Sequence, residues 1–386
     1  MLSDRPMSRR RVLAACCAAM ATINYAISAP SMCVTSMAAE LVMDETWKGF
    51  FLSSPFWAFP LAILIAGPLA DRIGCRAVLL AGALLQSAGL LIISQADGRW
   101  LTVVGGLVVG AGTGSVDAVL TPIVCALYPE QRARKTTLLH AFYAIGLVGT
   151  VLAMLAMLGG GAGWRTVFLV LGIAPLPVAA GIFFVPMPAQ IHAEGEARLR
   201  ARQVVLAPAF LGLMLAIFLG GLTEIGPSSW LPDYVRQTTS GGLWAGGLGL
   251  LLFGVAMTVS RLSGSALATR LGAGRLFTMG SVICAGSLLL AALPVGTLWT
   301  VACLTLLGLG VAIYWPMIMS VAGDRYPQGG ASMYSLLAMA GNLGGIVGPL
   351  MIGLVSERAG PRLAMLAVAA GPIVILFLML RLAPKK

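Results

Sequence analysis

The sequence predicts an all-α integral membrane protein with twelve transmembrane helices in two six-helix, pseudo-symmetric halves. The 386-residue chain is 59% hydrophobic and only 10% charged, whereas the surface of a soluble domain of this size needs a larger charged fraction. Its apolar residues form continuous segments of about 20 residues, the length of a helix that crosses a bilayer. A membrane β-barrel would instead show alternating segments of about 10 residues.

Twelve apolar segments are long enough to cross a bilayer. Their expected ranges are 12–38, 48–70, 76–94, 100–128, 136–158, 165–185, 207–235, 243–269, 275–293, 299–322, 331–356 and 361–382. The longest connection, 186–206, contains charged residues and no apolar run. We therefore expect an N-terminal half over 1–185, a cytoplasmic linker over 186–206 and a C-terminal half over 207–386.

A charged turn between the second and third segments is repeated in the C-terminal half. Gly67–Arg76 reads GPLADRIGCR, and Gly264–Arg275 reads GSALATRLGAGR. The matching Leu-Ala pairs of the two turns lie 198 positions apart, and a Tyr-Pro pair at Tyr128 recurs at Tyr326 with the same offset. The repeat indicates that one six-helix unit occurs twice.

The basic residues predict the orientation in the membrane. Of the 25 Lys and Arg residues, 18 flank segment ends on one side, 6 flank the other side, and Arg261 lies inside a segment. Because cytoplasmic loops carry the excess of Lys and Arg, we expect both termini and the turn Gly67–Arg76 in the cytoplasm of a multi-pass inner (plasma) membrane protein. The net charge of +11 then reflects topology, with membrane lipid and no nucleic acid as a partner.

Several functional classes find no support in the sequence. There is no G-x-x-x-x-G-K-[ST] loop, so ATP is not expected to drive the protein. The seven cysteines are scattered without metal-site or disulfide spacing, and no catalytic constellation is visible. We therefore expect no enzyme activity, no catalytic residues, no metal and no cofactor, and a monomeric protein.

The twelve segments, the two related halves and the G-x-L-A-D-R-x-G-x-R turn resemble the major facilitator superfamily over essentially the whole chain. The resemblance implies a secondary transporter whose halves rock about a central site, giving alternating access. It also implies that the turn forms a gate, in which Asp71 meets the N-terminal end of the helix that begins near Ala331. The expected gating residues are Gly67, Asp71, Arg72, Gly74 and Arg76.

Three further stretches are informative, namely Asp117 to Pro122, Leu138 to Gly146, and Gly221 to Glu224 followed by Trp230 and Tyr234. They resemble the fucose-permease-like branch of sugar–proton symporters. This branch carries an acid four residues before an Asn-Pro pair in helix 4, and its helix 7 contains a Gly-x-x-Glu stretch. The chain departs from the pattern at Thr121, which stands in place of the Asn, and at Asn24 and Tyr25, where the branch has a second acid. The resemblance implies proton-coupled symport of a small polar, sugar-like solute.

Three ionisable residues lie deep in the predicted helices, namely Asp117, Glu224 and Arg261. A charge in hydrocarbon costs at least about 2.5–3.5 kcal/mol, so each should face a polar cavity or a partner. We predict Asp117 and Glu224 as proton-coupling carboxylates, with Glu224 beside a helix notch formed by its neighbouring Gly and Pro residues. Structural hydrogen bonding or pairing is the alternative for both acids. Arg261 could bind an anionic solute, pair with Asp117 or brace the cytoplasmic gate.

Polar and aromatic residues complete the predicted substrate site, because an aromatic ring with a polar tip suits sugars and similar solutes. Each one alone is more often a packing or interfacial residue. Open alternatives are a drug or metabolite efflux antiporter, an organic-anion carrier that uses Arg261, and a non-transporting membrane receptor. The predicted substrate-binding residues are Asn24, Tyr25, His140, Tyr143, Glu224, Trp230, Arg261, Tyr314, Trp315 and Asn342.

Overall fold

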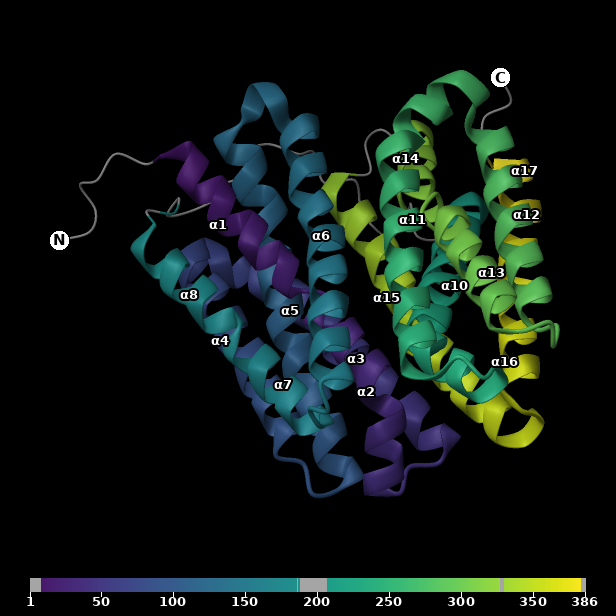
Figure 1. Cartoon of the computed structure of the whole chain (residues 1–386). Coiled ribbons are helices and arrows are strands. Elements are labelled where there is room, and N and C mark those ends of the chain that lie inside the picture. The colour runs from purple at the N-terminus through teal and green to yellow at the C-terminus, as the bar shows by residue number, and fades with distance from the viewer. Residues whose placement is uncertain (1–7, 186, 188–206, 327–329, 383–386) are drawn as a thin grey trace. The chain divides into compact units, whose positions relative to one another are not determined.

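The computed structural model describes residues 8–185, 187, 207–326 and 330–382. Within these ranges it contains twelve helical spans that are long and apolar enough to cross a membrane, and no strand (Figure 1). The predicted fold class is therefore confirmed. The predicted linker 186–206 lies outside the described residues, apart from Met187.

The chain forms two compact units. Unit 1 comprises Met1–Met43 and Ser54–Ala193, and unit 2 comprises Asp44–Ser53 and Glu194–Lys386. Segment Asp44–Ser53 thus belongs to unit 2. From Glu45 onward this segment forms the start of α3 (Glu45–Ile73), and the rest of that helix belongs to unit 1.

In unit 1, α4 packs along α5 through glycines on both helices. A Cβ atom at Gly89 would lie 2.5 Å from the Val109 nitrogen, and one at Gly105 would lie 2.8 Å from the Gly89 oxygen. Small residues allow this close backbone approach between membrane helices. The described elements of this part of the chain are α1 (Arg9–Thr22), α2 (Tyr25–Leu41), α3 (Glu45–Ile73), α4 (Cys75–Ser94), α5 (Arg99–Leu127), η1 (Pro129–Gln131), α6 (Arg132–Gly159), α7 (Trp164–Ile173) and α8 (Pro175–Phe184).

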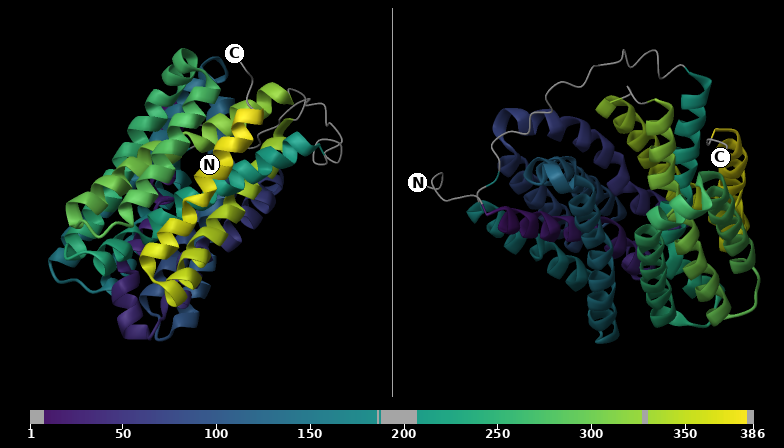
Figure 2. Two further views of the ribbon diagram at one scale, coloured as in Figure 1. Left: turned by 90° about the vertical axis from the view of Figure 1, so that its right-hand side faces the viewer. Right: turned by 90° about the horizontal axis from the view of Figure 1, so that it is seen from above.

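In unit 2, α10 and α15 lie side by side along much of their length (Figure 2). Their backbones touch at glycines here too, since a Cβ atom at Gly348 would lie 2.9 Å from the Leu222 oxygen. The described helices are α10 (Pro208–Thr238), α11 (Gly242–Leu271), α12 (Ala273–Ala291), α13 (Thr297–Val311), α14 (Tyr314–Arg325), α15 (Gly330–Ala359), α16 (Pro361–Val368) and α17 (Ala370–Leu382).

Prolines explain why three predicted spans are divided in two. Proline lacks the backbone N–H that would bond the carbonyl four residues earlier, and its ring crowds that carbonyl. The spans predicted as continuous over 165–185, 299–322 and 361–382 each break within a few residues before a proline. The helix ends and their prolines are Ile173 with Pro177, Val311 with Pro316, and Val368 with Pro372.

The two copies of the repeated turn also share a backbone conformation. Gly74 precedes α4 with φ 89°, and Gly272 precedes α12 with φ 77°. Residues with a Cβ rarely adopt this region, whereas glycine enters it freely. The two copies therefore share the conformation that requires glycine, although Asp71 of the first copy is replaced by Thr269 in the second.

A further repeat, which the sequence prediction missed, lies at the start of the sixth span in each half. The motif A-G-W-R ends at Arg165, and A-G-P-R ends at Arg362. Arg165 forms an ion pair with Glu40 near the end of α2, and Arg362 donates a 3.2 Å hydrogen bond to the Thr238 carbonyl at the end of α10. Each arginine thus ties the start of the sixth span to the end of the first span of its own unit.

Gly110→Ala is expected to lower the stability of unit 1 by at least about 1–3 kcal/mol, the usual penalty of overpacking. An added Cβ would overlap the Pro55 carbonyl oxygen and lie 2.9 Å from the Pro55 Cα, and backbone cannot rotate away. Gly149 in α6 is the matched control, because no atom lies within 4 Å of its Cβ position. Thermal melting in detergent should show a loss for Gly110→Ala only; equal melting temperatures for both variants would refute the packing argument.

Candidate functional site

A partly buried ion pair joins two of the three ionisable residues predicted deep in the helices. Arg261 of α11 donates from Nη2 to Oε1 of Glu224 in α10 at 2.8 Å. The Glu224 side chain is 8% exposed and the Arg261 side chain 32%. Structural pairing was the alternative prediction for Glu224, and the structure shows such a pairing within its own half. The sequence analysis did not indicate Glu224 as the partner of Arg261.

The pair leaves two polar atoms unused. Glu224 Oε2 and Arg261 Nε are buried and hydrogen-bond to none of the described residues. Leaving a buried hydrogen-bond donor or acceptor unsatisfied costs about 1–3 kcal/mol, and more for a charged group. The pair thus offers one acceptor and one donor that a ligand could satisfy.

Glycines bring neighbouring helices close to the pair. A Cβ atom at Gly221 of α10 would overlap the Gly341 carbonyl of α15, and one at Gly220 would lie 3.3 Å from Tyr314 Cβ of α14. The predicted notch in this helix is wrong, because α10 is continuous over Pro208–Thr238 and includes Pro227. The glycines of this helix pack against neighbouring helices instead.

The other predicted unit 2 residues are held by protein partners. The buried Trp230 donates to a backbone carbonyl of α15 at 3.0 Å, and the buried Tyr314 donates to the Ser281 hydroxyl at 3.2 Å. Asn342 donates to a carbonyl of its own helix at 2.8 Å. Trp315 is half-buried, and its ring would lie 2.5 Å from a Cβ atom at Gly341 of α15. Each of these four side chains therefore has a hydrogen-bonding or packing partner within unit 2.

In unit 1, the predicted Asn24 and Tyr143 meet where the first span breaks. The span predicted as continuous over 12–38 divides into α1 and α2 at Asn24, which is fully buried. Its amide nitrogen donates to the Tyr143 carbonyl of α6, and its Oδ1 atom has no partner among the described residues. Tyr25 follows at the start of α2 and is half-buried.

A second polar group of unit 1 lies on α5 and α6. The Thr121 hydroxyl lies 3.3 Å from Nε2 of His140, whose side chain is exposed. Asp117 is one turn before Thr121 on the same side of α5, because residues four apart share a helix face. Asp117 is half-buried and makes no hydrogen bond or ion pair with the described residues. A carboxylate in this state can gain or lose a proton without breaking a contact.

The predicted gating residues surround the turn after α3. Asp71 and Arg72 are exposed, and no atom lies within 4 Å of a Cβ position at Gly67. Arg76 donates to the Val185 carbonyl at 2.8 Å, which ties α4 to the end of α8. The meeting of Asp71 with the start of α15 stays a prediction.

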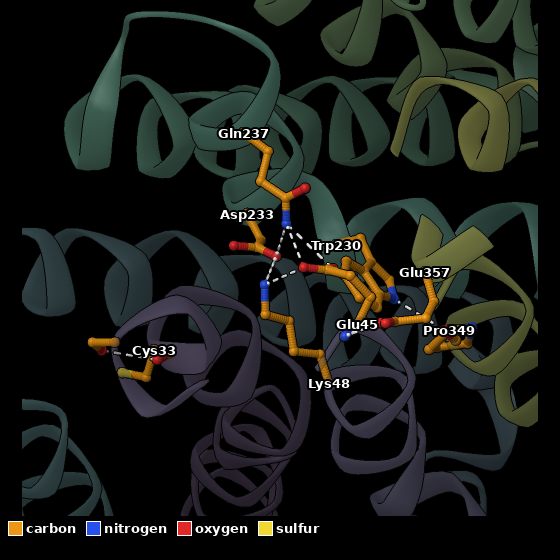
Figure 3. Close-up of polar contacts among 9 residues, drawn as sticks. Cys33, Glu45, Lys48, Trp230, Asp233, Gln237, Pro349 and Glu357 are labelled. Atoms are coloured by element: carbon orange, nitrogen blue, oxygen red, sulfur yellow. Dashed lines mark hydrogen bonds and ion pairs between the residues drawn. The ribbon is translucent and has the colours of Figure 1, made fainter. Parts of the chain in front are cut away.

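A polar cluster at one end of unit 2 was missed by the sequence prediction (Figure 3). Lys48 Nζ lies 3.0 Å from Asp233 Oδ2 and 2.8 Å from Glu45 Oε1, and Gln237 donates to Asp233 at 2.9 Å. Glu357 of α15 accepts the Glu45 backbone N–H at 2.8 Å. The side chain of Asp233 is 0% exposed and that of Lys48 8%, so two further charges are buried within helices. We call these five residues the Lys48 cluster.

The sequence comparisons identify relatives across most of the chain. The chain matches the family model of the Major Facilitator Superfamily over residues 12–349 and 247–386. It is 24% identical over 315 residues to membrane protein MosC of Rhizobium meliloti, covering 82% of this chain and 76% of that protein. It is 25% identical over 348 residues to a gentisate transporter of Corynebacterium glutamicum, covering 83% and 75%. A probable nitrate/nitrite transporter, NarK2 of Mycobacterium tuberculosis, is 26% identical over 334 residues, covering 83% and 82%.

Solved structures share the fold over nearly the full length. A variant of the nucleoside transporter NupG superposes with a TM-score of 0.79 at 14% identity, covering 97% of this chain and 98% of that one. The transporter FucP, in the outward conformation, superposes with a TM-score of 0.67 at 19% identity, covering 97% and 99%. With this fold and a family model that spans almost the whole sequence, the chain belongs to the Major Facilitator Superfamily and is a membrane transporter of small solutes.

Proposed function

We propose that this transporter carries a small, neutral, sugar-like solute across the inner membrane by alternating access, in symport with protons. The observation that carries the proposal is the partly buried pair of Glu224 and Arg261, joined at 2.8 Å with one acceptor and one donor unused. We place the solute at this pair.

The charges of the pair favour a neutral solute. Arg261 and Glu224 cancel each other, so the pair has no net charge to attract an ion. A solute hydroxyl can donate to Glu224 Oε2 and accept from Arg261, because a hydroxyl is both donor and acceptor. Both unused atoms are covered, so the solute would reach them once Arg261, whose side chain is 32% exposed, changes its rotamer.

Asp117 is the proposed proton-coupling residue, together with Glu224. It is a half-buried carboxylate without a partner among the described residues. Burial penalises the charged form of a carboxylate, and binding a proton removes that penalty. Proton binding at Asp117 therefore supplies a change of charge that can favour one state of the transport cycle over another.

The proposed setting is the bacterial-type inner membrane, with both termini in the cytoplasm and the protein acting as a monomer. The support is the distribution of basic residues, of which 18 flank one side and 6 the other. Excess Lys and Arg mark the cytoplasmic side of short loops.

An organic-anion carrier is the second candidate. Arg261 uses only its Nη2 atom to bond Glu224 and keeps an unpartnered Nε. Guanidinium groups bind carboxylates through two parallel hydrogen bonds, so a solute carboxylate could compete with Glu224. Two relatives named above, the gentisate and the nitrate/nitrite transporters, carry names of anionic solutes.

Uptake into proteoliposomes distinguishes the two candidates. Labelled neutral sugars and polyols are compared with labelled mono- and dicarboxylates of similar size. We expect uptake of at least one neutral solute, reduced at least about tenfold in Glu224→Gln, because a neutral amide keeps the shape but loses a charge-assisted hydrogen bond. Uptake restricted to carboxylates, lost in Arg261→Gln and kept in Glu224→Gln, would overturn the neutral-solute proposal in favour of the anion carrier.

A further inference from the structure

Three side chains hold the end of α2, and we call them the Glu40 clamp, namely Glu40, Trp164 and Arg165. Trp164 Nε1 donates to Glu40 Oε2 at 2.6 Å, and Arg165 forms an ion pair with Glu40. The Arg165 Cζ atom lies 4.1 Å from the centre of the Trp164 ring. Arg165 Nη2 also donates at 2.8 Å to the carbonyl of Ala96, two residues after α4. The clamp therefore joins the end of α2 to the start of α7 and to the end of α4.

The helix α2 depends on contacts of this kind because the first span is interrupted. α1 ends at Thr22 and α2 begins at Tyr25. At the interruption the backbone N–H groups of Ile23 and Ala26 bond carbonyls three residues earlier, at 3.3 and 3.4 Å. Bonds to the third residue back have poorer geometry than the regular bonds of an α-helix. The far end of α2 is therefore fixed less by α1 than by its contacts with other helices.

The matching end in unit 2 has further bonds. α10 is one continuous helix. Near its end the buried Trp230 donates to a carbonyl of α15 at 3.0 Å, and the buried Tyr234 donates to the last carbonyl of α12 at 2.9 Å. The positions 198 residues earlier hold Met32, which has no hydrogen-bond donor, and Ser36, which bonds a carbonyl of its own helix at 2.8 Å. Arg362 thus adds to a helix end that two other side chains already hold, whereas Arg165 serves an end without these two counterparts.

The backbone directly after the clamp is strained. Val42 has φ 52° and is the one residue other than glycine with a positive φ among those that the structure describes. A positive φ is an outlier for a β-branched residue, and such conformations persist only where the surroundings impose them. The Val42 side chain is 80% exposed, so its own packing does not impose this conformation. The clamp, two residues earlier, fixes the chain on the α2 side of this turn.

We propose that Glu40 and Arg165 are positioning residues on which unit 1 depends to hold α2, whereas the matching contact of Arg362 is dispensable for holding α10. Two predicted substrate-binding residues, Asn24 and Tyr25, lie at the start of α2, so fixing α2 also fixes them. The proposal concerns how a helix is held and not the solute, so it stands or fails independently of the proposed function.

Distances between spin labels in the full-length protein in nanodiscs test this proposal. Nitroxide labels on Val42→Cys and Trp100→Cys report the distance between the end of α2 and the start of α5. Labels on Ser240→Cys and Leu298→Cys report the matching distance in unit 2, because the 198-residue offset relates the two pairs of positions. All four positions are exposed. Cys125→Ser is included in every sample, since the other six cysteines are buried.

Arg165→Gln and Glu40→Ala should each broaden the distance distribution of unit 1 at least about twofold, because the end of α2 then opens locally. Arg362→Gln is the same change at the matching position of the repeat. It should leave the width of the unit 2 distribution as in the wild type, since Trp230 and Tyr234 still hold the end of α10.

The difference between the units separates this proposal from a merely structural repeat. Equal broadening in both units would show that the two arginines have the same role and would overturn it. An unchanged distribution in unit 1, or a response to only one of Arg165→Gln and Glu40→Ala, would overturn it as well. Loss of the melting transition in both unit 1 variants would show that the clamp holds the whole unit rather than α2, which also contradicts the proposal.

Discussion

Arg261→Gln is expected to abolish transport and to lower the free energy of unfolding by about 3–5 kcal/mol, the range for removing one partner of a buried pair. Glu224, whose side chain is 8% exposed, would remain as a buried charge without its counter-charge. The change combines the loss of the proposed solute site with the desolvation penalty of an isolated carboxylate. Thermal melting in detergent and uptake in proteoliposomes measure the two effects separately.

Arg270→Gln is the matched control, because it makes the same change on the same helix, α11, at an exposed position. Surface substitutions of this kind usually stay within about 0.5 kcal/mol. Glu224→Gln combined with Arg261→Gln should recover much of the stability lost in Arg261→Gln without restoring transport, since position 224 then holds no unpaired buried charge. If Arg261→Gln melts like Arg270→Gln, the pair contributes nothing to stability and the argument from burial is wrong.

Asp117→Asn is expected to uncouple transport from the proton gradient while leaving exchange of solute across the membrane intact. Asparagine has nearly the same shape as aspartate but cannot bind and release a proton at this position. A pH difference of one unit across the membrane corresponds to about 1.36 kcal/mol per proton. Symport of one proton per solute therefore supports about tenfold accumulation of the solute for each unit of that difference. In proteoliposomes that contain the variant, the internal solute concentration should rise only to the external concentration.

Asp324→Asn is the control for this prediction, because Asp324 is an exposed acid at the end of α14. It should accumulate solute as the wild type does. Wild-type accumulation by Asp117→Asn would show that the coupling proton binds elsewhere, with Glu224 as the remaining proposed site.

The fold was predictable because hydropathy and helix length are properties of continuous segments. Twelve apolar segments of membrane length appear as twelve spans among the residues that the structure describes. The repeated turn reappears with glycine at positive φ at both Gly74 and Gly272. The breaks inside the spans were harder to predict. Proline explains the breaks before Pro177, Pro316 and Pro372. The break at Asn24 has no such proline, and the contact that Asn24 makes there with α6 is not revealed by sequence spacing.

The candidate site was predictable as a set of residues and not as a set of contacts. Depth in an apolar segment singled out Glu224 and Arg261, since charges there need a partner, but their pairing depends on which faces of α10 and α11 meet. Lys48 and Asp233 lie near helix ends, where charges are common, and their burial arises from contacts between residues 185 positions apart. The repeat ending at Arg165 and Arg362 did carry a sequence signal, namely a four-residue motif at nearly the same offset as the turn.

Accumulation of labelled neutral solutes by proteoliposomes with an alkaline interior tests the role of the Glu224–Arg261 pair most directly. The wild type should concentrate at least one sugar or polyol above its external level, and collapsing the pH gradient should abolish that accumulation. Proteoliposomes that contain Glu224→Gln should take up the same solute much more slowly than those that contain the wild type. Uptake by Glu224→Gln at the wild-type rate, or accumulation by the wild type that ignores the pH gradient, would contradict the proposed solute site or its coupling to protons.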